Sequence, residues 1–223
     1  MSGAALRPSP GDGICPLCAG RSTSPFHTDG PREYRLCGDC ALIFVPPSMR
    51  LMPLEEVVRY VQHDNRRDDP RYEQFLRRLA DPLRRRLSPG DRGLDFGCGP
   101  VPVLAELLIA DGFPTASYDP VFAPDEDVLE ETYDFISCSE VVEHLHDPAG
   151  VFERFARMLR PGGTLGVMTR FYGHEAPFDV WWYRRDPTHV CFYREETMQW
   201  IARRHGWTAG FPAPHVVLFG ADR

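Results

Sequence analysis

From residue 91 onward, short apolar runs alternate with segments in which apolar residues recur every three or four positions. Short apolar runs are typical of buried strands, and the longer spacing is typical of helices with one packed face. Their alternation predicts a parallel sheet with crossover helices, which is an α/β fold. The expected strands are 93–96, 115–118, 133–138, 164–169, 207–211 and 215–219, and the expected helices are 101–110, 140–145, 148–159 and 194–205.

The part of the chain before residue 91 has a different pattern. Leucine and aromatic residues recur at helical spacing over residues 71–87, which predicts an amphipathic helix with one buried stripe. Its other face is rich in arginine, which suits RNA or an anionic substrate or, more commonly, solvent and nearby acidic side chains. Residues 41–45 suit a short strand, and Pro46 and Pro47 then mark a linker. We therefore expect an N-terminal module over 1–47, a helical linker or cap over 48–90 and a core domain over 91–223.

Four cysteines of the N-terminal module are arranged in two pairs. Cys15 and Cys18 form one C-x-x-C turn, and Cys37 and Cys40 form a second turn after residues 19–36. This spacing matches the four-cysteine zinc pattern, in a stretch with too few apolar residues to fold alone. Four thiolates leave no open position for a catalytic water, so the sequence predicts a structural zinc ribbon. A pair of disulfides is the alternative, which a cytoplasmic location disfavours.

Composition narrows the range of functions. The chain has 223 residues, of which 43% are hydrophobic, enough for one medium domain with a small appendage. It lacks a long apolar run and the apolar core of a signal peptide, so we expect a soluble cytoplasmic protein without membrane contact. The net charge of −7 disfavours nucleic acid as a partner. All 25 basic residues are arginine, which excludes Schiff-base catalysis and the lysine of a phosphate-binding P-loop.

The first core strand ends in a glycine turn. Asp95, Gly97 and Gly99 form this turn, and the second strand ends in Asp119, at the separation expected of a carboxylate that binds ribose. Two prolines at the start of the following helix lack the N–H groups that would hold a pyrophosphate. The pattern therefore predicts a ligand that carries a ribose but no phosphate.

These motifs resemble a known enzyme family. LDFGCGP, YDP, YDFISCSEVVEHLHDP and LRPGGTLGVMT are similar to the successive motifs of class I S-adenosylmethionine-dependent methyltransferases, across roughly residues 70–223. The resemblance implies that Asp95, Gly97 and Gly99 surround the methionine portion of the cofactor and that Asp119 holds the ribose hydroxyls. Cysteine turns before such a core resemble a bacterial subgroup with a small zinc module, which includes some sugar-directed enzymes.

One departure from the family pattern concerns the third strand. Only 14 residues, 120–133, separate Asp119 from Asp134, too few for a helix, a strand and an adenine-binding loop. The expected fold is therefore a Rossmann-like class I methyltransferase sheet with a reduced third strand and a small N-terminal zinc ribbon.

A group of acidic and histidine residues follows the third expected core strand. On a helix, Glu140 would neighbour Glu143 and His144, so the three side chains would converge at the carboxyl edge of the sheet. Two carboxylates and an imidazole suit a divalent cation of intermediate hardness. A second histidine, His189, comes later in the chain.

This arrangement resembles the magnesium or manganese site of small-RNA 3′-terminal 2′-O-methyltransferases. Its E-x-x-E-H part also resembles the ubiquinone-pathway O-methyltransferases. The resemblance implies that Glu140, Glu143, His144 and His189 bind the metal, with Glu143, His144 and His189 at the reaction centre. The alternative is that Glu140 caps a helix, His144 acts alone as general base and His189 packs in the core. Both interpretations keep His144 at the reaction centre.

The leading interpretation is O-methylation of a hydroxyl on a small molecule, such as a sugar or secondary-metabolite precursor, because a metal acidifies a coordinated hydroxyl. An RNA-terminal 2′-O-methyltransferase is the first alternative. A zinc-module binding protein with a degenerate, non-catalytic methyltransferase scaffold is the second.

Aromatic residues over 171–183 suit either a lid over the substrate or a core or dimer patch.

Overall fold

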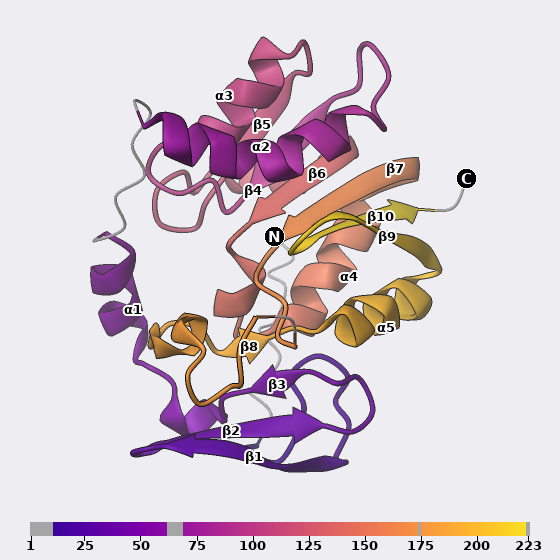
Figure 1. Cartoon of the computed structure of the whole chain (residues 1–223). Coiled ribbons are helices and arrows are strands. Elements are labelled where there is room, and N and C mark those ends of the chain that lie inside the picture. The colour runs from indigo at the N-terminus through magenta and orange to yellow at the C-terminus, as the bar shows by residue number, and fades with distance from the viewer. Residues whose placement is uncertain (1–10, 62–68, 174, 222–223) are drawn as a thin grey trace.

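The computed structural model describes residues 11–61, 69–173 and 175–221, which form two sheets (Figure 1). The larger sheet has six strands in the order β5-β4-β6-β7-β10-β9. Its strands are β4 (Gly93–Phe96), β5 (Thr115–Tyr118), β6 (Tyr133–Ser139), β7 (Leu159–Met168), β9 (Trp207–Ala213) and β10 (Val216–Ala221). The strands β4 to β7 are parallel, whereas β10 runs antiparallel to β7 and to β9.

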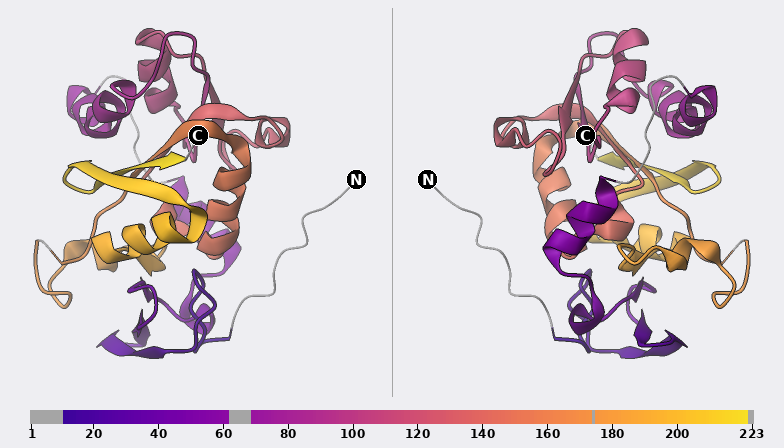
Figure 2. Two further views of the ribbon diagram at one scale, coloured as in Figure 1. Left: turned by 90° about the vertical axis from the view of Figure 1, so that its right-hand side faces the viewer. Right: turned by 90° about the vertical axis from the view of Figure 1, so that its left-hand side faces the viewer.

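Helices cover both faces of this sheet (Figures 1 and 2). They are α2 (Pro70–Arg84) and α3 (Val103–Ala110) on one face and α4 (Pro148–Met158) and α5 (Glu195–His205) on the other. Phe135 on β6 packs in one core with Leu79 and Leu104, whereas its neighbour Ile136 packs in the other core with Phe155. This alternation along one strand places a core on each side of the sheet, so the predicted α/β fold is confirmed. None of the helices in the described ranges combines the length and apolar character of a bilayer span.

The prediction of a reduced third strand is confirmed. Between Asp119 and Tyr133 the structure has an isolated bridge from Asp119 to Ala123 and a short 3-10 turn, η2 (Glu126–Leu129). The strand β5 is therefore the edge of the sheet on this side. The other expected strands are all present, although β7 begins earlier than predicted, and its pairing with β6 shifts register where Pro161 and two glycines lie.

The helix predicted over 140–145 is wrong. The structure has only a 3-10 turn there, η3 (Val142–His144). Glu140 has a φ of +52°, in the left-handed region, and its N–H still bonds to Met168 O of β7 at 2.8 Å. A right-handed helix cannot begin at such a residue. The next helix, α4, begins after Asp147, whose carboxylate accepts the Gly150 N–H at 3.0 Å as an N-cap.

The helix predicted over 71–87 is present as α2. Leu76, Leu79 and Leu83 are buried along one stripe, as predicted. On the opposite face, Arg77 bonds to Asp111 at 2.6 Å, and other arginines bond to acidic groups or a carbonyl oxygen. The arginines of this face are thus paired with nearby acidic or carbonyl groups, which is the more common of the two arrangements expected from the sequence.

Three of the four strands of the smaller sheet come from the N-terminal module. The strands of this sheet, in the order β1-β2-β3-β8, are β1 (Thr23–Asp29), β2 (Arg32–Cys37), β3 (Ile43–Phe44) and β8 (Cys191–Phe192). Because β8 comes from far along the chain, this sheet crosses the boundary predicted between the module and the core domain. A turn, η1 (Pro47–Met49), and a helix, α1 (Pro53–Tyr60), follow the module. Residues 1–10 and 62–68, which belong to the first two predicted parts, lie outside the described residues.

Most aromatic side chains of the segment 171–183 pack in the core, which favours the core interpretation over a lid. Phe178 and Trp181 are buried, and Phe178 contacts Tyr34 of the N-terminal module with ring centroids 4.9 Å apart. Trp182, on the turn η4 (Trp182–Arg185), is instead exposed over 55% of its surface. The segment joins the N-terminal module to the larger sheet through edge-to-face aromatic packing.

Candidate functional site

The glycine turn, which contains Gly97 and Gly99, lies directly after the carboxyl end of β4. Gly97 has a φ of +79°, and a Cβ at this position would lie 2.3 Å from Val141 Cγ2. Its N–H donates to Tyr118 O at 2.7 Å, which ties the turn to the end of β5. Glycine is therefore required here by both conformation and space. The contact with Val141 also brings the turn next to the segment that carries Glu143 and His144.

Asp119 lies at the end of β5 and is bonded to the turn. Its Oδ2 accepts the Gly99 N–H at 3.1 Å, and its Oδ1 accepts the N–H groups of Val121 and Phe122 at 2.9 and 3.0 Å. A carboxylate oxygen accepts about two hydrogen bonds. Among the described residues, Oδ2 accepts the Gly99 N–H, which leaves one acceptor position for a further donor.

Asp95 lies deeper, near the end of β4. It is 3% exposed, and its Oδ1 accepts the Ser137 Oγ–H at 2.9 Å. Burial raises the pKa of this carboxyl group to about 7. Asp95 thus links β4 to β6, whereas Asp119 is bonded directly to the turn.

Three of the four residues predicted at the metal site come together. Glu143, His144 and His189 each place one donor atom within 4.8 Å of the others. Glu143 is fully buried, and it accepts the Tyr183 hydroxyl at 2.6 Å through Oε1 and the Thr169 hydroxyl at 2.9 Å through Oε2. These two donors fix the orientation of a buried carboxylate.

Both histidines bond to a backbone carbonyl oxygen through the same ring nitrogen. His144 Nδ1 lies 3.2 Å from Thr188 O, and His189 Nδ1 lies 2.7 Å from Tyr183 O. A carbonyl oxygen only accepts hydrogen bonds, so Nδ1 of each ring is the donor, and a lone pair for a metal would come from Nε2. Burial lowers the pKa of His189 to about 4, which keeps this ring neutral. Histidines that bind metals have this arrangement, in which the other ring N–H donates to a carbonyl or carboxylate.

Glu140, the fourth predicted ligand, lies outside this group. Its Oε2 is 3.4 Å from the Tyr183 hydroxyl, which stands between Glu140 and Glu143. Burial and the nearby Glu143 carboxylate raise the pKa of Glu140. The predicted convergence of Glu140 assumed a helix that is absent.

The four cysteines of the N-terminal module form a second cluster. Cys15 Sγ lies 3.5 Å from Cys40 Sγ, and Cys18 Sγ lies 3.5 Å from Cys37 Sγ. A disulfide would need about 2.05 Å, so the disulfide alternative is wrong for these cysteines, which are all free. Tetrahedral zinc with Zn–S bonds of about 2.3 Å requires sulfurs roughly 3.8 Å apart. The four sulfurs all lie within 4.8 Å of one another and therefore fit a zinc module.

The two cysteine turns have the same backbone conformation. Ala19 and Ala41, each directly after the second cysteine of a pair, have φ values of +57° and +59°. The N–H of each donates to the carbonyl of the first cysteine of its pair at 3.0 Å. Gly20 N–H also donates to Cys18 Sγ at 3.3 Å. The two turns thus present their sulfurs in matching geometry.

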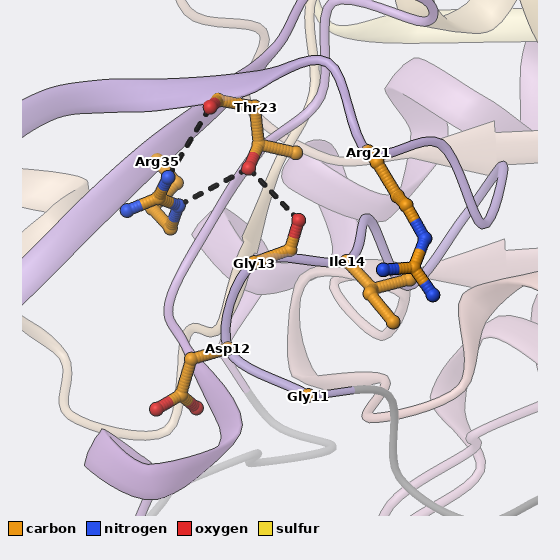
Figure 3. Close-up of a pocket in the computed structure, with 7 residues that line it drawn as sticks. All are labelled: Gly11, Asp12, Gly13, Ile14, Arg21, Thr23 and Arg35. Atoms are coloured by element: carbon orange, nitrogen blue, oxygen red, sulfur yellow. Dashed lines mark hydrogen bonds between the residues drawn. The ribbon is translucent and has the colours of Figure 1, made fainter.

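A shallow pocket of about 440 Å³ lies elsewhere on the N-terminal module (Figure 3). It is lined by Gly11, Asp12, Gly13, Ile14, Arg21, Thr23 and Arg35. Arg35 donates to the Thr23 hydroxyl and carbonyl, both at 3.2 Å, so its guanidinium supports the wall of the pocket. None of these residues belongs to the sheet edge that carries Asp119 and Glu143.

Comparison with known proteins agrees with the fold described above. The model of a family described as a methyltransferase domain matches residues 63–209. The chain belongs to the class I S-adenosylmethionine-dependent methyltransferases. This methyltransferase is 35% identical to the ubiquinone biosynthesis O-methyltransferase of Pseudomonas savastanoi pv. phaseolicola over 78 residues, which are 34% of this chain and 33% of that enzyme. It is 33% identical to the Xylella fastidiosa enzyme of the same name over an alignment 106 positions long, which covers 36% of this chain and 42% of that enzyme.

The methyltransferase thus spans about a third of the length of the first curated relatives that it matches. Among solved structures it is similar to 1,6-didemethyltoxoflavin-N1-methyltransferase of Burkholderia thailandensis, with a TM-score of 0.54 and 16% identity, covering 89% of this chain and 99% of that one. It is also similar to magnesium protoporphyrin IX methyltransferase of Synechocystis, with a TM-score of 0.51 and 11% identity, covering 76% and 94%. At these identities the likeness shows the fold.

Sequence reasoning missed two residues of the methyltransferase's candidate centre. Tyr183 was noted only as one aromatic residue among several, and Thr169 only as the end of a strand. Their hydroxyls both donate to Glu143, although they lie 40 and 26 residues away from it. The available signal was weak, because a hydroxyl beside a strand end or within an aromatic run has many structural uses.

Proposed function

We propose that this methyltransferase transfers a methyl group from S-adenosylmethionine to a hydroxyl of a small molecule, at a divalent-cation site formed by Glu143, His144 and His189. The observation that carries the proposal is the position of this cluster. It lies at the carboxyl edge of the sheet, and its Glu143 is two residues beyond Val141, which lies against the glycine turn. In open α/β sheets this edge is where ligands bind.

For the cofactor, we infer that Asp95, Gly97, Gly99 and Asp119 bind S-adenosylmethionine. The solved structures of the Burkholderia and Synechocystis methyltransferases named above contain S-adenosylhomocysteine, which supports S-adenosylmethionine as the cofactor here. The free acceptor position of Asp119 Oδ2 suits a ribose hydroxyl. The shortened segment after Asp119 leaves the adenine side more open than a full third strand would.

The donor set of the centre fits a manganese or magnesium ion. One carboxylate and two imidazoles are borderline ligands, which favour manganese over magnesium because magnesium prefers oxygen. A bound cation of this kind lowers the pKa of a coordinated hydroxyl and so generates a nucleophile. Tyr183 and Thr169 keep Glu143 oriented. His144 is the least buried of the three, and its ring packs edge-to-face against Tyr60 of α1, with centroids 5.3 Å apart.

Supporting observations favour a small hydroxyl-bearing substrate over the alternatives. The curated relatives are named O-methyltransferases of ubiquinone biosynthesis. An RNA terminus is disfavoured, because the net charge is −7 and the arginines of α2 that the structure describes bond to acidic groups and a carbonyl. A non-catalytic scaffold would have no use for two oriented imidazole lone pairs.

For the N-terminal module, we propose a structural zinc on Cys15, Cys18, Cys37 and Cys40. The four sulfurs have the separations of a tetrahedral site, and four thiolates leave no position for substrate. The two cation sites would therefore have separate roles, one in folding and one in chemistry.

The test is activity after selective metal removal. A mild chelator should remove the ion from the carboxylate and imidazole site first, because the thiolate site is closed and binds zinc more tightly. We expect methyl transfer to a panel of small phenols and sugars to stop on chelation and to return with Mn²⁺ or Mg²⁺, at unchanged zinc content. Full activity in the chelated enzyme would leave His144 as an ordinary general base.

A further inference from the structure

The loop that carries His189 is held from two sides. On one side, Val190 N–H donates to Glu143 O at 2.8 Å, which ties the loop to the candidate centre. On the other side, Val45 N–H donates to Val190 O at 2.9 Å, and β8 directly after it pairs with β3. The backbone of a single residue thus connects the centre to the N-terminal module.

Arg32, the first residue of β2, holds the same loop more extensively. Its terminal nitrogens donate to four backbone carbonyls, those of Arg184 at 3.4 Å, Asp186 at 3.1 Å, Pro187 at 3.2 Å and His189. The four N–H groups of these two nitrogens therefore each have a partner on one loop. His189 N–H in turn donates to Asp186 O at 3.2 Å, so the backbone of His189 is fixed at both its N–H and its carbonyl.

The loop also positions a second part of the centre. Tyr183, next to Arg184, donates its hydroxyl to Glu143 and accepts the His189 Nδ1–H through its carbonyl at 2.7 Å. Its ring lies against that of His189, with centroids 4.2 Å apart. A shift of residues 184–189 would therefore move one candidate ligand and the hydroxyl that orients another.

We propose that Arg32 is a positioning residue of the candidate catalytic centre, through which the N-terminal module fixes the geometry of His189. Arg32 bonds to the backbone of the loop and acts through it. The strand β2 begins at Arg32 and ends at Cys37, so the thiolate cluster anchors one end of the strand and the loop engages the other. The proposal rests on the proposed function, because it takes Glu143, His144 and His189 as the metal site.

The physical reason is the precision that such a site needs. Groups that orient a metal ligand typically change metal affinity by about tenfold to a hundredfold when they are lost. A lysine at position 32 would keep the charge, but it is a compact point charge and cannot reproduce the planar fork of a guanidinium. It cannot serve four carbonyls spread over residues 184–189.

The experiment compares Arg32→Lys with Arg35→Lys. Arg35 lies on the same strand, and among the described residues it donates to Thr23 of the same module, so it is a matched control. Mn²⁺ alone is the probe for the centre, and its binding is measured by electron paramagnetic resonance.

We expect Arg32→Lys to weaken Mn²⁺ binding about tenfold to a hundredfold. Arg35→Lys should leave it within twofold of the wild type, and both variants should keep wild-type affinity for S-adenosylhomocysteine. Equal Mn²⁺ affinity in Arg32→Lys and the wild type would overturn the proposal.

A second measurement separates this proposal from the proposed function. Hydrogen exchange of the amides of residues 184–192 should be faster in Arg32→Lys alone, with unchanged exchange in β4 and β6. If the wild type binds no Mn²⁺, the proposed metal site fails, and exchange then decides whether Arg32 holds the loop. Unchanged exchange in Arg32→Lys overturns the positioning role in either case. If Arg32→Lys and Arg32→Gln both fail to fold while Arg35→Lys folds, Arg32 serves stability, and the proposal is also overturned.

Discussion

The two candidate cation sites differ in how their donor atoms reach one point. The four thiolates come from two similar turns within residues 15–40, and each turn fixes its own pair of sulfurs through local hydrogen bonds. The Glu143, His144 and His189 donors come from two segments that meet only in the folded molecule. The first site can be recognised from spacing, whereas the second depends on the packing that surrounds it.

The two sites also differ in how many coordination positions they leave for a substrate. Four thiolates complete a tetrahedral zinc shell, so the first site suits folding. One carboxylate and two imidazoles leave coordination positions for a substrate oxygen, so the second suits chemistry. The shared sheet β1-β2-β3-β8 links them, and this link means that damage to the first site should reach the second.

The largest expected effect is that of Cys37→Ser, which removes one thiolate from the closed site. Zinc binding supplies on the order of 10 kcal/mol to small zinc modules, so the module should lose most of its structure. We expect elemental analysis to find less than one zinc per chain and Mn²⁺ binding to the open site to be lost.

Binding of S-adenosylhomocysteine should survive in Cys37→Ser, because Asp119 and the glycine turn lie on the larger sheet. Ser24→Ala is the control, since Ser24 is an exposed residue of β1 outside the thiolate cluster. Intact Mn²⁺ binding in zinc-free Cys37→Ser protein would show that the two sites are independent.

Next in size is His189→Ala, which removes a donor from the open site alone. Loss of a group that activates the nucleophile typically lowers turnover by about 10²- to 10⁴-fold. Zinc content and cofactor affinity should stay unchanged, as measured by elemental analysis and calorimetry. His205→Ala, on α5, is the matched control and should keep full turnover. Normal turnover in His189→Ala would reduce His189 to a packing residue.

Asp119→Ala should affect the cofactor and neither cation site. Removal of the charged acceptor costs about 1.5–3 kcal/mol, which corresponds to roughly tenfold to a hundredfold weaker binding of S-adenosylhomocysteine. Calorimetry measures this directly. Glu130→Ala, an exposed residue on the same side of the sheet, is the control. Unchanged affinity in Asp119→Ala would mean that the ribose is held elsewhere.

The smallest expected effect is that of Ala19→Gly in the first cysteine turn. Ala19 has a φ of +57°, which glycine adopts without steric cost. We expect the free energy of unfolding to rise by about 0.5–1 kcal/mol in chemical denaturation, with Mn²⁺ affinity unchanged. Ala156→Gly within α4 should have the opposite sign, because glycine destabilises a helix interior by about 1 kcal/mol. A loss of stability in Ala19→Gly would contradict the assigned strain.

The sequence predicted those features whose causes are local. The strands 93–96 and 115–118 were predicted at their observed bounds, because each is a short apolar run between turn residues. The cysteine pairs and the adjacent Glu143 and His144 were also found from spacing. Glu140 was misplaced, because nothing in the residue types signals that the chain leaves β6 in a left-handed conformation.

The remaining features depend on contacts between distant segments. The two-residue strand β8 is too short to have a pattern of its own and exists because β3 pairs with it. The bonds of Arg32 to residues 184–189 and of Tyr183 to Glu143 are likewise set by the tertiary fold. The function of the aromatic segment could not be decided from the sequence, because a lid and a core use the same residues.

The pairing of β3 with β8 also imposes an order of events during protein synthesis. About 150 residues separate these strands, and at 5–20 residues per second a ribosome takes roughly 7–30 s to make them. During this interval one edge of β3 lacks its native partner, and an unpaired edge can associate with other chains. Zinc needs only residues 15–40, so it can stabilise the N-terminal hairpin before β8 emerges. Metal supply during translation should therefore influence how much of the newly made protein escapes aggregation.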